Sequence, residues 1–175
     1  MNLVLLAGNS YRNKEWIYRV KEVLSPLFDK SFVLEYAHWQ SGEEEINLDN
    51  EILTLSNKLI NDSNYSIFAK SVGSIVALKG INDGVLKPIK IIIAGLPLFS
   101  IMESGTPFGK WLENSDVPLL IIQNTSDPLG SYLDVKKYFL ELNIKSKYKI
   151  IELPGDDHSY NDLPKLKELV AEFIK

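Results

Sequence analysis

The stretch Tyr65-Ser66-Ile67-Phe68-Ala69-Lys70-Ser71-Val72-Gly73, followed by Ser74-Ile75-Val76-Ala77-Leu78, decides the fold. An apolar run typical of a buried strand leads into a run typical of a helix, with Ser71 at the turn between them. Ala69 and Gly73 are small, as residues must be where the strand and helix backbones nearly touch. The pattern predicts a nucleophile elbow, a strained turn that projects the serine hydroxyl outward, with Ala69 in place of the usual glycine.

The composition is that of an ordinary globular protein. The chain has 175 residues, of which 45% are hydrophobic and 24% charged, so we expect one domain over residues 1–175 and no membrane span. It has no cysteine, which excludes disulfides, thiol catalysis and cysteine-based zinc sites. A net charge of -4 argues against nucleic-acid binding. The first residues lack the basic segment and long apolar run of a signal peptide, so a cytoplasmic location is expected.

Six short apolar runs alternate with longer segments of helical periodicity. The expected strands are residues 2–6, 31–36, 65–69, 90–94, 118–122 and 147–153. The expected helices are residues 13–24, 49–61, 72–80, 106–113, 132–142 and 163–174. Strict alternation predicts right-handed crossovers and a three-layer α/β sandwich around a parallel sheet, whose central strands are the continuous apolar runs 91–94 and 119–122. The polar, acidic segment 39–48 is expected to be a solvated loop.

Three residues with complementary chemistry each follow the carboxyl end of an expected strand. Ser71 follows the third strand, Asp127 the fifth and His158 the sixth. Ligands of open α/β sheets bind at this edge of the sheet. The order Ser, Asp, His is also the order that α/β-hydrolases use for their catalytic triad.

On the elbow, this order and the motif Gly155-Asp156-Asp157-His158-Ser159, the chain resembles the α/β-hydrolase superfamily over nearly its whole length. It looks most like small, lidless members related to the dienelactone hydrolases, although those use a cysteine nucleophile that this chain lacks. The resemblance implies a truncated α/β-hydrolase fold that starts at the third strand of the full fold. The implied sheet has six parallel strands in the order 2-1-3-4-5-6. Only about twenty residues separate the fourth and fifth strands, which leaves no room for a large lid.

The expected roles follow from what acyl transfer needs. Ser71 is the nucleophile, and His158 is the base that takes its proton and returns it to the leaving group. Asp127 holds the imidazole of His158 in the right tautomer. The backbone N–H of Val72 is the first oxyanion donor, because it lies at a helix N-terminus. The superfamily resemblance points to the N–H of Asn9 or of Ser10 as the second donor.

Loop positions suggest a shallow substrate cleft walled by apolar side chains. The candidates are Tyr11, Trp39, Leu98, Phe99 and Leu129, with Met102 and Phe108 beside them. We expect no cofactor and no metal site, since there are only two histidines and no ligand spacing. The expected partner is a small-molecule substrate, and the exposed sheet edges allow a monomer or a homodimer.

Several residues compete with the proposed triad. His38 is the rival base, but it does not follow the last strand and can instead line the pocket rim or pack on Trp39. Lys70 could serve as the base of a Ser-Lys pair, although adjacent residues at a turn usually diverge. The other acids are placed less well than Asp127: they precede a strand, lie within a helix or adjoin His158 in sequence, as do Asp116, Asp134, Asp156 and Asp157.

The sequence thus predicts a serine hydrolase that cleaves a small ester, thioester or amide through an acyl-enzyme. Two other classes stay open. The chain could be a non-catalytic module of the same fold that binds a partner or small ligand, because fold does not imply function. It could also be a flavodoxin-like nucleotide or flavin binder, although no glycine-rich phosphate loop follows Gly8.

Overall fold

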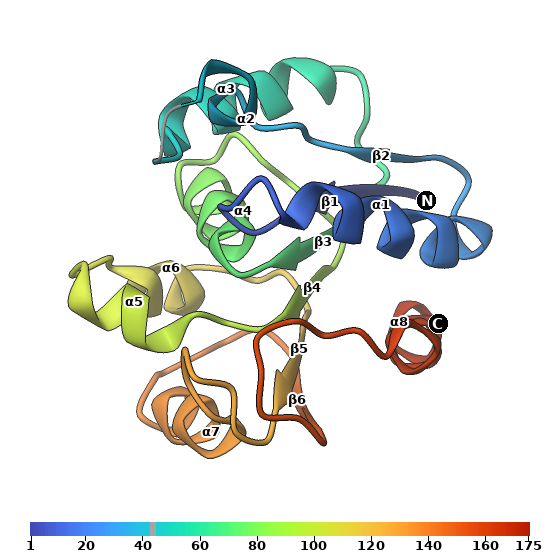
Figure 1. Cartoon of the computed structure of the whole chain (residues 1–175). Helices are drawn as coiled ribbons and strands as arrows, with labels where there is room; N and C mark the ends of the chain where they lie inside the picture. The colour runs from blue at the N-terminus through green and yellow to red at the C-terminus, as the bar shows by residue number, and fades with distance from the viewer. Residues whose placement is uncertain (43–44) are drawn as a thin grey trace.

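A six-stranded parallel sheet forms the centre of the molecule, in a computed structural model that describes residues 1–42 and 45–175 (Figure 1). The strand order is β2-β1-β3-β4-β5-β6. The strands are β1 (Asn2–Leu6), β2 (Ser31–Val33), β3 (Tyr65–Lys70), β4 (Ile91–Ala94), β5 (Leu119–Asn124) and β6 (Tyr148–Leu153). The structure confirms the predicted α/β sandwich, its parallel sheet and its strand order.

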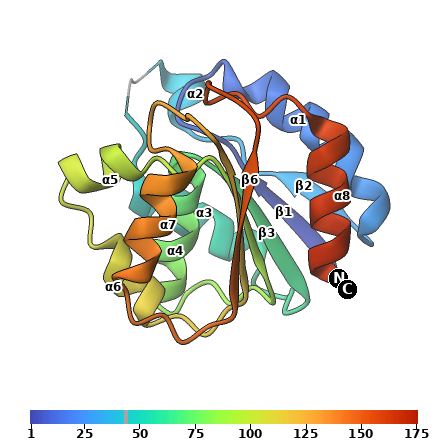
Figure 2. The ribbon, with the colours of Figure 1, turned by 90° about the horizontal axis from the view of Figure 1, so that it is seen from below.

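Helices cover both faces of this sheet and give three layers (Figure 2). The helices are α1 (Asn13–Leu24), α2 (His38–Ser41), α3 (Leu48–Lys58), α4 (Val72–Asn82), α5 (Leu98–Glu103), α6 (Phe108–Glu113), α7 (Tyr132–Leu140) and α8 (Leu163–Ile174), with a 3-10 turn, η1 (Ser25–Leu27). Helices α1 and α8 contact each other on one face, whereas α4 contacts α3 and α6 on the other. Among the described residues, no helix is both long and apolar enough to cross a membrane.

The central strands are buried on both faces, as their unbroken apolar sequences predict. Every residue of β3, β4 and β5 is buried, whereas β6, at the sheet edge, is exposed or partly buried at every residue except Leu153. All five strand pairs are parallel, so the carboxyl ends of the strands meet at one edge. That edge carries the residues after β1, β3, β4, β5 and β6 that the site requires.

Two of the expected loops contain helices. The prediction of a loop over residues 39–48 is wrong at both ends of this segment, because α2 begins at His38 and α3 begins at Leu48. Trp39 anchors α2 by donating from Nε1 to the Asn9 carbonyl, and the Asn47 side chain caps α3 by accepting from Asn50 N–H. Residues 43–44, in the acidic part of this segment, lie outside the described residues. Helix α5 likewise occupies part of the loop expected after β4, with Leu98 and Ile101 buried.

Gly73 allows α4 to start against the end of β1. A Cβ atom at Gly73 would lie 2.7 Å from the Leu6 carbonyl oxygen and 2.8 Å from that of Ala7. Both distances are much shorter than a van der Waals contact between carbon and oxygen. The two oxygens belong to the backbone, so they cannot move aside as a flexible side chain could. Only glycine therefore lets the first turn of α4 pack at this distance from β1.

Replacing Gly73 by alanine should force α4 away from β1 and lower the free energy of unfolding by about 1–3 kcal/mol. Gly80→Ala is a matched control in the same helix, because an added Cβ there meets side-chain atoms of Leu86 and Ile52 rather than backbone. Urea denaturation of both variants measures the difference. A loss at Gly73 no greater than the loss at Gly80 would contradict this account of the contact.

Candidate active site

Ser71 has a strained backbone conformation at the turn from β3 into α4. Its φ is 52° and its ψ is -124°, a region that non-glycine residues rarely occupy. Four hydrogen bonds hold it. Ser71 N–H donates to the Gly95 carbonyl at 3.1 Å and to the Ala94 carbonyl at 3.4 Å, and the Ser71 carbonyl accepts from Ser74 N–H at 2.9 Å and Ser74 Oγ at 2.6 Å. Strain of about 1–3 kcal/mol is typical of such residues and is often found at active sites.

Asp127 and His158 form a direct hydrogen-bonded pair. His158 Nδ1 lies 2.7 Å from Asp127 Oδ2 and 3.0 Å from Oδ1. The Asp127 side chain is fully buried, and the His158 side chain is 18% exposed. Because Nδ1 donates to the carboxylate, Nε2 carries the lone pair and can accept a proton. Nε2 is buried and has no hydrogen-bond partner within the described part of the chain.

Gly95, just after β4, lies next to both Ser71 and His158. Its carbonyl accepts from Ser71 N–H, and a Cβ at this residue would lie 2.9 Å from His158 Cε1, the ring atom bonded to Nε2. The φ of Gly95 is 68°, so glycine is favoured here for conformation as well as for space. The serine turn and the imidazole therefore border the same residue.

Tyr160 is a member of this network that the sequence analysis missed. Its hydroxyl donates to Asp127 Oδ2 at 2.7 Å and accepts from Asn124 N–H at 2.9 Å. Burial and the Asp127 carboxylate raise the pKa of the Tyr160 phenol far above its usual value, so the phenol stays protonated and donates. With Leu129 N–H on Oδ1 at 2.9 Å, the carboxylate of Asp127 is held from three sides.

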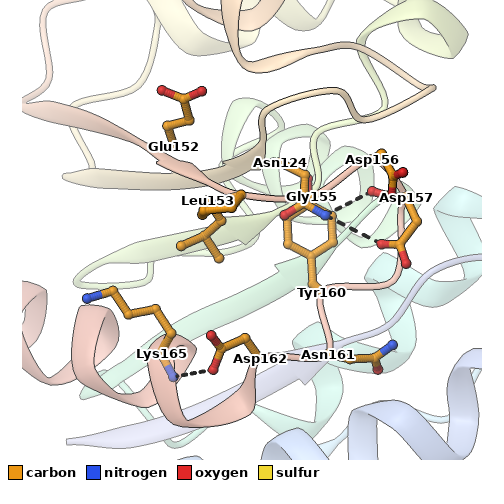
Figure 3. A pocket seen from close by; sticks show the side chains of 11 residues that line it. Asn124, Glu152, Leu153, Gly155, Asp156, Asp157, Tyr160, Asn161, Asp162 and Lys165 are labelled. Atoms are coloured by element: carbon orange, nitrogen blue, oxygen red, sulfur yellow. Dashed lines mark hydrogen bonds between the residues drawn. The ribbon is translucent and has the colours of Figure 1, made fainter.

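Asn124, the last residue of β5, fixes the loop that carries His158. Its Nδ2 donates to the Asp157 carbonyl at 2.9 Å, and dashed lines in Figure 3 join the Asn124 amide to Asp157. A pocket of about 390 Å³ lies against this loop, lined by residues that include Asp156, Asp162 and Lys165. Its lining contains neither Ser71 nor His158, so it lies outside the candidate active site.

The loop after β1 is anchored by its carbonyl groups. The Asn9 carbonyl accepts from His38 Nε2 at 2.7 Å and from Trp39 Nε1 at 2.8 Å. The Ala7 carbonyl accepts from the Tyr36 hydroxyl at 2.8 Å. The bonds to the Asn9 carbonyl fix the Asn9–Ser10 peptide, which carries Ser10 N–H, and the bond to the Ala7 carbonyl fixes the Ala7–Gly8 peptide. The Gly8–Asn9 peptide, which carries Asn9 N–H, lies between these two fixed planes.

His38, the rival base, is buried in this anchor rather than beside Ser71. Its ring stacks on Tyr36 at 5.7 Å and contacts Trp39 at 6.1 Å between centroids. Buried Glu51 accepts from Ala37 N–H at 2.7 Å and lies close enough to interact with His38, and burial raises the pKa of Glu51. His38 therefore packs on Trp39, one of the two placements expected from the sequence.

A pocket of about 460 Å³, here called the Ser71 pocket, contains Ser71, Val72 and Asn9 in its lining. The other lining residues are Glu45, Ile46, Leu48, Ile75, Pro97, Ser100, Ser104, Thr106 and Leu129. Val72 and Asn9, two of the three predicted oxyanion residues, thus border the same space as the serine. Ser10 is absent from this lining; its side chain instead accepts from Arg12 N–H.

Most of the predicted cleft walls lie elsewhere. Leu129 lines the Ser71 pocket as expected, but Leu98 and Phe99 line a separate pocket of about 190 Å³ with residues of α7. Helix α5 turns these two side chains away from the serine, and Met102 lies beside them. Tyr11 is 61% exposed and packs edge-on to Trp39, and Phe108 is fully buried in the core.

Lys70 is a buried cation next to the serine in sequence. Only 4% of its surface is exposed, and its Nζ lies 5.5 Å from the centre of the Trp16 ring. It lines a different pocket from Ser71, so the neighbouring side chains diverge as expected. Burial lowers the pKa of Lys70 to about 8, against the opposing influence of Asp127 and Asp157.

The arrangement is suited to proton transfer to and from a group at Ser71. A fixed carboxylate orients the imidazole of His158, the His158 ring and Ser71 both border Gly95, and Val72 and Asn9 line the pocket that contains Ser71. Among the described residues, no cluster of three or more histidine, cysteine or acidic side chains could hold a metal ion.

Comparison with known proteins supports the fold and the family. Residues 39–172, which include Ser71, Asp127 and His158, match the model of the alpha/beta hydrolase domain family. No curated protein matches the chain. Solved structures with this fold include an esterase from Pyrococcus furiosus, with TM-score 0.79 and 17% identity over 99% of this chain and 80% of that one.

Two further structures are similar at comparable levels. An alpha-beta serine hydrolase homologue from Coxiella burnetii has TM-score 0.78 and 17% identity, covering 100% of this chain and 85% of that one. Est1E from Butyrivibrio proteoclasticus, solved with ferulic acid bound, has TM-score 0.75 and 13% identity, covering 99% and 87%. At these identities the likeness concerns the fold alone.

Removing the Tyr160 hydroxyl should destabilise the protein, because it leaves the buried Asn124 N–H without an acceptor and takes one of three hydrogen-bond donors from the buried Asp127 carboxylate. We expect Tyr160→Phe to lower the free energy of unfolding by about 1–3 kcal/mol. Tyr148→Phe is the control, since Tyr148 is 40% exposed on the edge strand and should cost less than about 0.5 kcal/mol. If urea denaturation gave equal losses of unfolding free energy for the two variants, the hydrogen bonds of the Tyr160 hydroxyl would not be important for stability.

The buried charge of Lys70 should make stability depend on pH. The folded pKa of about 8 lies below the ordinary 10.5, so the unfolded chain binds more protons between these values and stability rises with pH there. Lys70→Met should therefore be more stable than the unsubstituted protein below about pH 8, and this advantage should vanish above about pH 10.5. Urea denaturation across this range tests it, and a pH-independent difference would refute it.

Proposed function

This chain belongs to the alpha/beta hydrolase domain family, and we propose that it is a serine hydrolase that cleaves a small ester, thioester or amide. Family membership supports hydrolase activity in general. The finer proposal concerns the mechanism: an acyl-enzyme forms on Ser71, with His158 as the base and Asp127 as its orienting acid. The observation that carries it is the Asp127–His158 hydrogen bond, which leaves His158 Nε2 as an acceptor beside the Ser71 turn.

In the first half-reaction, Ser71 Oγ attacks the carbonyl carbon while His158 Nε2 takes the serine proton. The tetrahedral intermediate then collapses: the bond to the leaving group breaks, and His158 returns the proton to the leaving atom. In the second half-reaction, water attacks the acyl-enzyme and gives a proton to His158. Collapse of that intermediate releases the acid and restores the Ser71 hydroxyl.

The oxyanion of both intermediates would be stabilised by two backbone N–H groups. Val72 N–H lies at the start of α4, where the helix dipole favours negative charge. Asn9 or Ser10 would supply the second N–H, and the place of Asn9 in the Ser71 pocket favours Asn9. The hydrogen bonds of His38 and Trp39 to the Asn9 carbonyl would hold this loop in place before substrate binds.

The Ser71 pocket sets the size of the acyl group. Its volume is about 460 Å³, and its apolar walls include Ile46, Leu48 and Ile75. Such a space fits a modest acyl chain better than a long one, since the serine and threonine side chains of α5 and the loop after it close part of the lining.

The test is hydrolysis of para-nitrophenyl esters of increasing acyl length. Ser71→Ala should lower kcat by a factor of about 10³ or more, because no other group can form the acyl-enzyme. Ser63→Ala, in the exposed loop before β3, is the matched control and should leave the rate unchanged. The acyl length with the highest kcat/KM then measures the length of acyl chain that the Ser71 pocket accommodates.

A fluorophosphonate probe gives an independent readout. Its phosphorus should bond to Ser71 Oγ with loss of fluoride, and labelling should disappear in Ser71→Ala. Labelling without ester turnover would point to a narrow, different substrate. Neither labelling nor turnover, in protein shown to be folded, would instead favour a non-catalytic binding module.

A further inference from the structure

A pocket of about 280 Å³ borders His158 on the side of α1, and we call it the basic pocket. It is defined by three cationic side chains, Arg12, Arg19 and Lys70, together with His158. Trp16, Ser159 and two asparagines complete the lining, and none of the described residues in it is acidic. Arg12, Trp16 and Arg19 are spaced four and three residues apart, so they lie on one face at the start and middle of α1.

The three cations have no direct ion-pair partner among residues 1–42 and 45–175. In the part of the chain that the structure describes, no hydrogen bond or ion pair engages the guanidinium of Arg12 or Arg19 or the Nζ of Lys70. Lys70 is the most telling, because a buried ammonium without a paired anion costs several kcal/mol. Residues that carry such a cost are commonly retained for function.

Asp127 and Asp157 are the carboxylates whose charge acts on Lys70, and no hydrogen bond joins either of them to its Nζ among the described residues. Both oxygens of Asp127 are already occupied, by His158 Nδ1, the Tyr160 hydroxyl and Leu129 N–H. Asp127 and Asp157 act on Lys70 through their charge alone. An anion that enters the basic pocket would therefore be the direct partner of these cations.

We propose that the basic pocket binds an anionic group, a carboxylate or a phosphate, on the leaving group of the substrate. This inference rests on the proposed function, because it assigns the two pockets to the two halves of one substrate. Ser71, Val72 and Asn9 line the Ser71 pocket, which would take the acyl group. His158 lines the basic pocket, and the leaving atom must lie beside His158 to receive its proton.

The test compares two esters of similar size and shape: para-acetoxybenzoate, whose leaving group carries a carboxylate, and para-acetoxybenzamide, whose leaving group is neutral. In both, acetyl passes to Ser71 Oγ and the phenol leaves with the proton from His158. The unsubstituted enzyme should have the higher kcat/KM for para-acetoxybenzoate. Para-acetoxyphenyl phosphate is the third substrate, and whichever anion gives the larger preference over the neutral ester identifies the preferred group.

The charge preference should depend on the basic pocket and not on net charge. Arg12→Gln and Arg19→Gln should each reduce it about 2- to 5-fold, the range of exposed ion pairs. Lys70→Met should reduce it about 10-fold or more, because its ammonium is buried. Lys21→Gln is the control: it removes one positive charge from α1 outside the pocket and should leave the preference unchanged.

The outcomes separate this inference from the proposed function. One outcome would overturn the proposed role of the basic pocket while supporting the proposed hydrolase activity. In that outcome para-acetoxybenzamide is hydrolysed in a Ser71-dependent way, and the enzyme either shows no preference for the charged ester or shows one that all four variants leave unchanged. If neither ester is hydrolysed, calorimetric titration of Ser71→Ala with para-hydroxybenzoate and para-hydroxybenzamide tests the pocket directly. Tighter binding of the carboxylate that Lys70→Met abolishes would support the pocket, and equal binding of the two would refute it.

Discussion

The close approach of β3, α4 and β1 is the constraint on which the rest of the site depends. The chain passes from strand to helix through one residue, Ser71, and its positive φ makes that turn possible. Gly73 then lets α4 begin within contact of the β1 carbonyls. This approach places the α4 N-terminus and the loop after β1 in one pocket with the serine, so a single packing contact positions both Ser71 and the proposed oxyanion donors. The backbone strain is offset by the bonds from Gly95 and Ser74 and by the burial of α4.

The sequence predicted the sheet well because its central strands are unbroken apolar runs and the elements alternate regularly. The boundaries of α1 and α8 also follow directly from their apolar periodicity. The misses were short elements: α2 has four residues and α5 has six, too few to show a helical period. Trp39 shows the reason, since a hydrogen bond to the Asn9 carbonyl, distant in sequence, holds α2 where local composition suggested a loop.

The residues of the candidate site could be predicted only where their order along the chain determines their place in the fold. Ser71, Asp127 and His158 could be named because parallel strands bring their carboxyl ends to one edge. Tyr160 could not, because its bond to Asp127 depends on a positive φ of 55° and on rotamers that no spacing reveals. The places of Leu98 and Phe99 could not be predicted for a similar reason, since α5 directs these two side chains toward α7. The roles of the three site residues, the single domain, the cytoplasmic location and the oligomeric state stay predictions.

The distribution of charge argues for a local origin of any preference for anions. The protein as a whole carries a net charge of -4, and Asp127 and Asp157 lie near the base, so the long-range field repels an anion. Only groups within a few ångströms can reverse that repulsion, and Arg12, Arg19 and Lys70 are gathered on one side of His158. Salt screens the distant charges more than a buried ammonium. Raising the ionic strength should therefore weaken the repulsion and the contribution of the arginines while it leaves most of the contribution of Lys70.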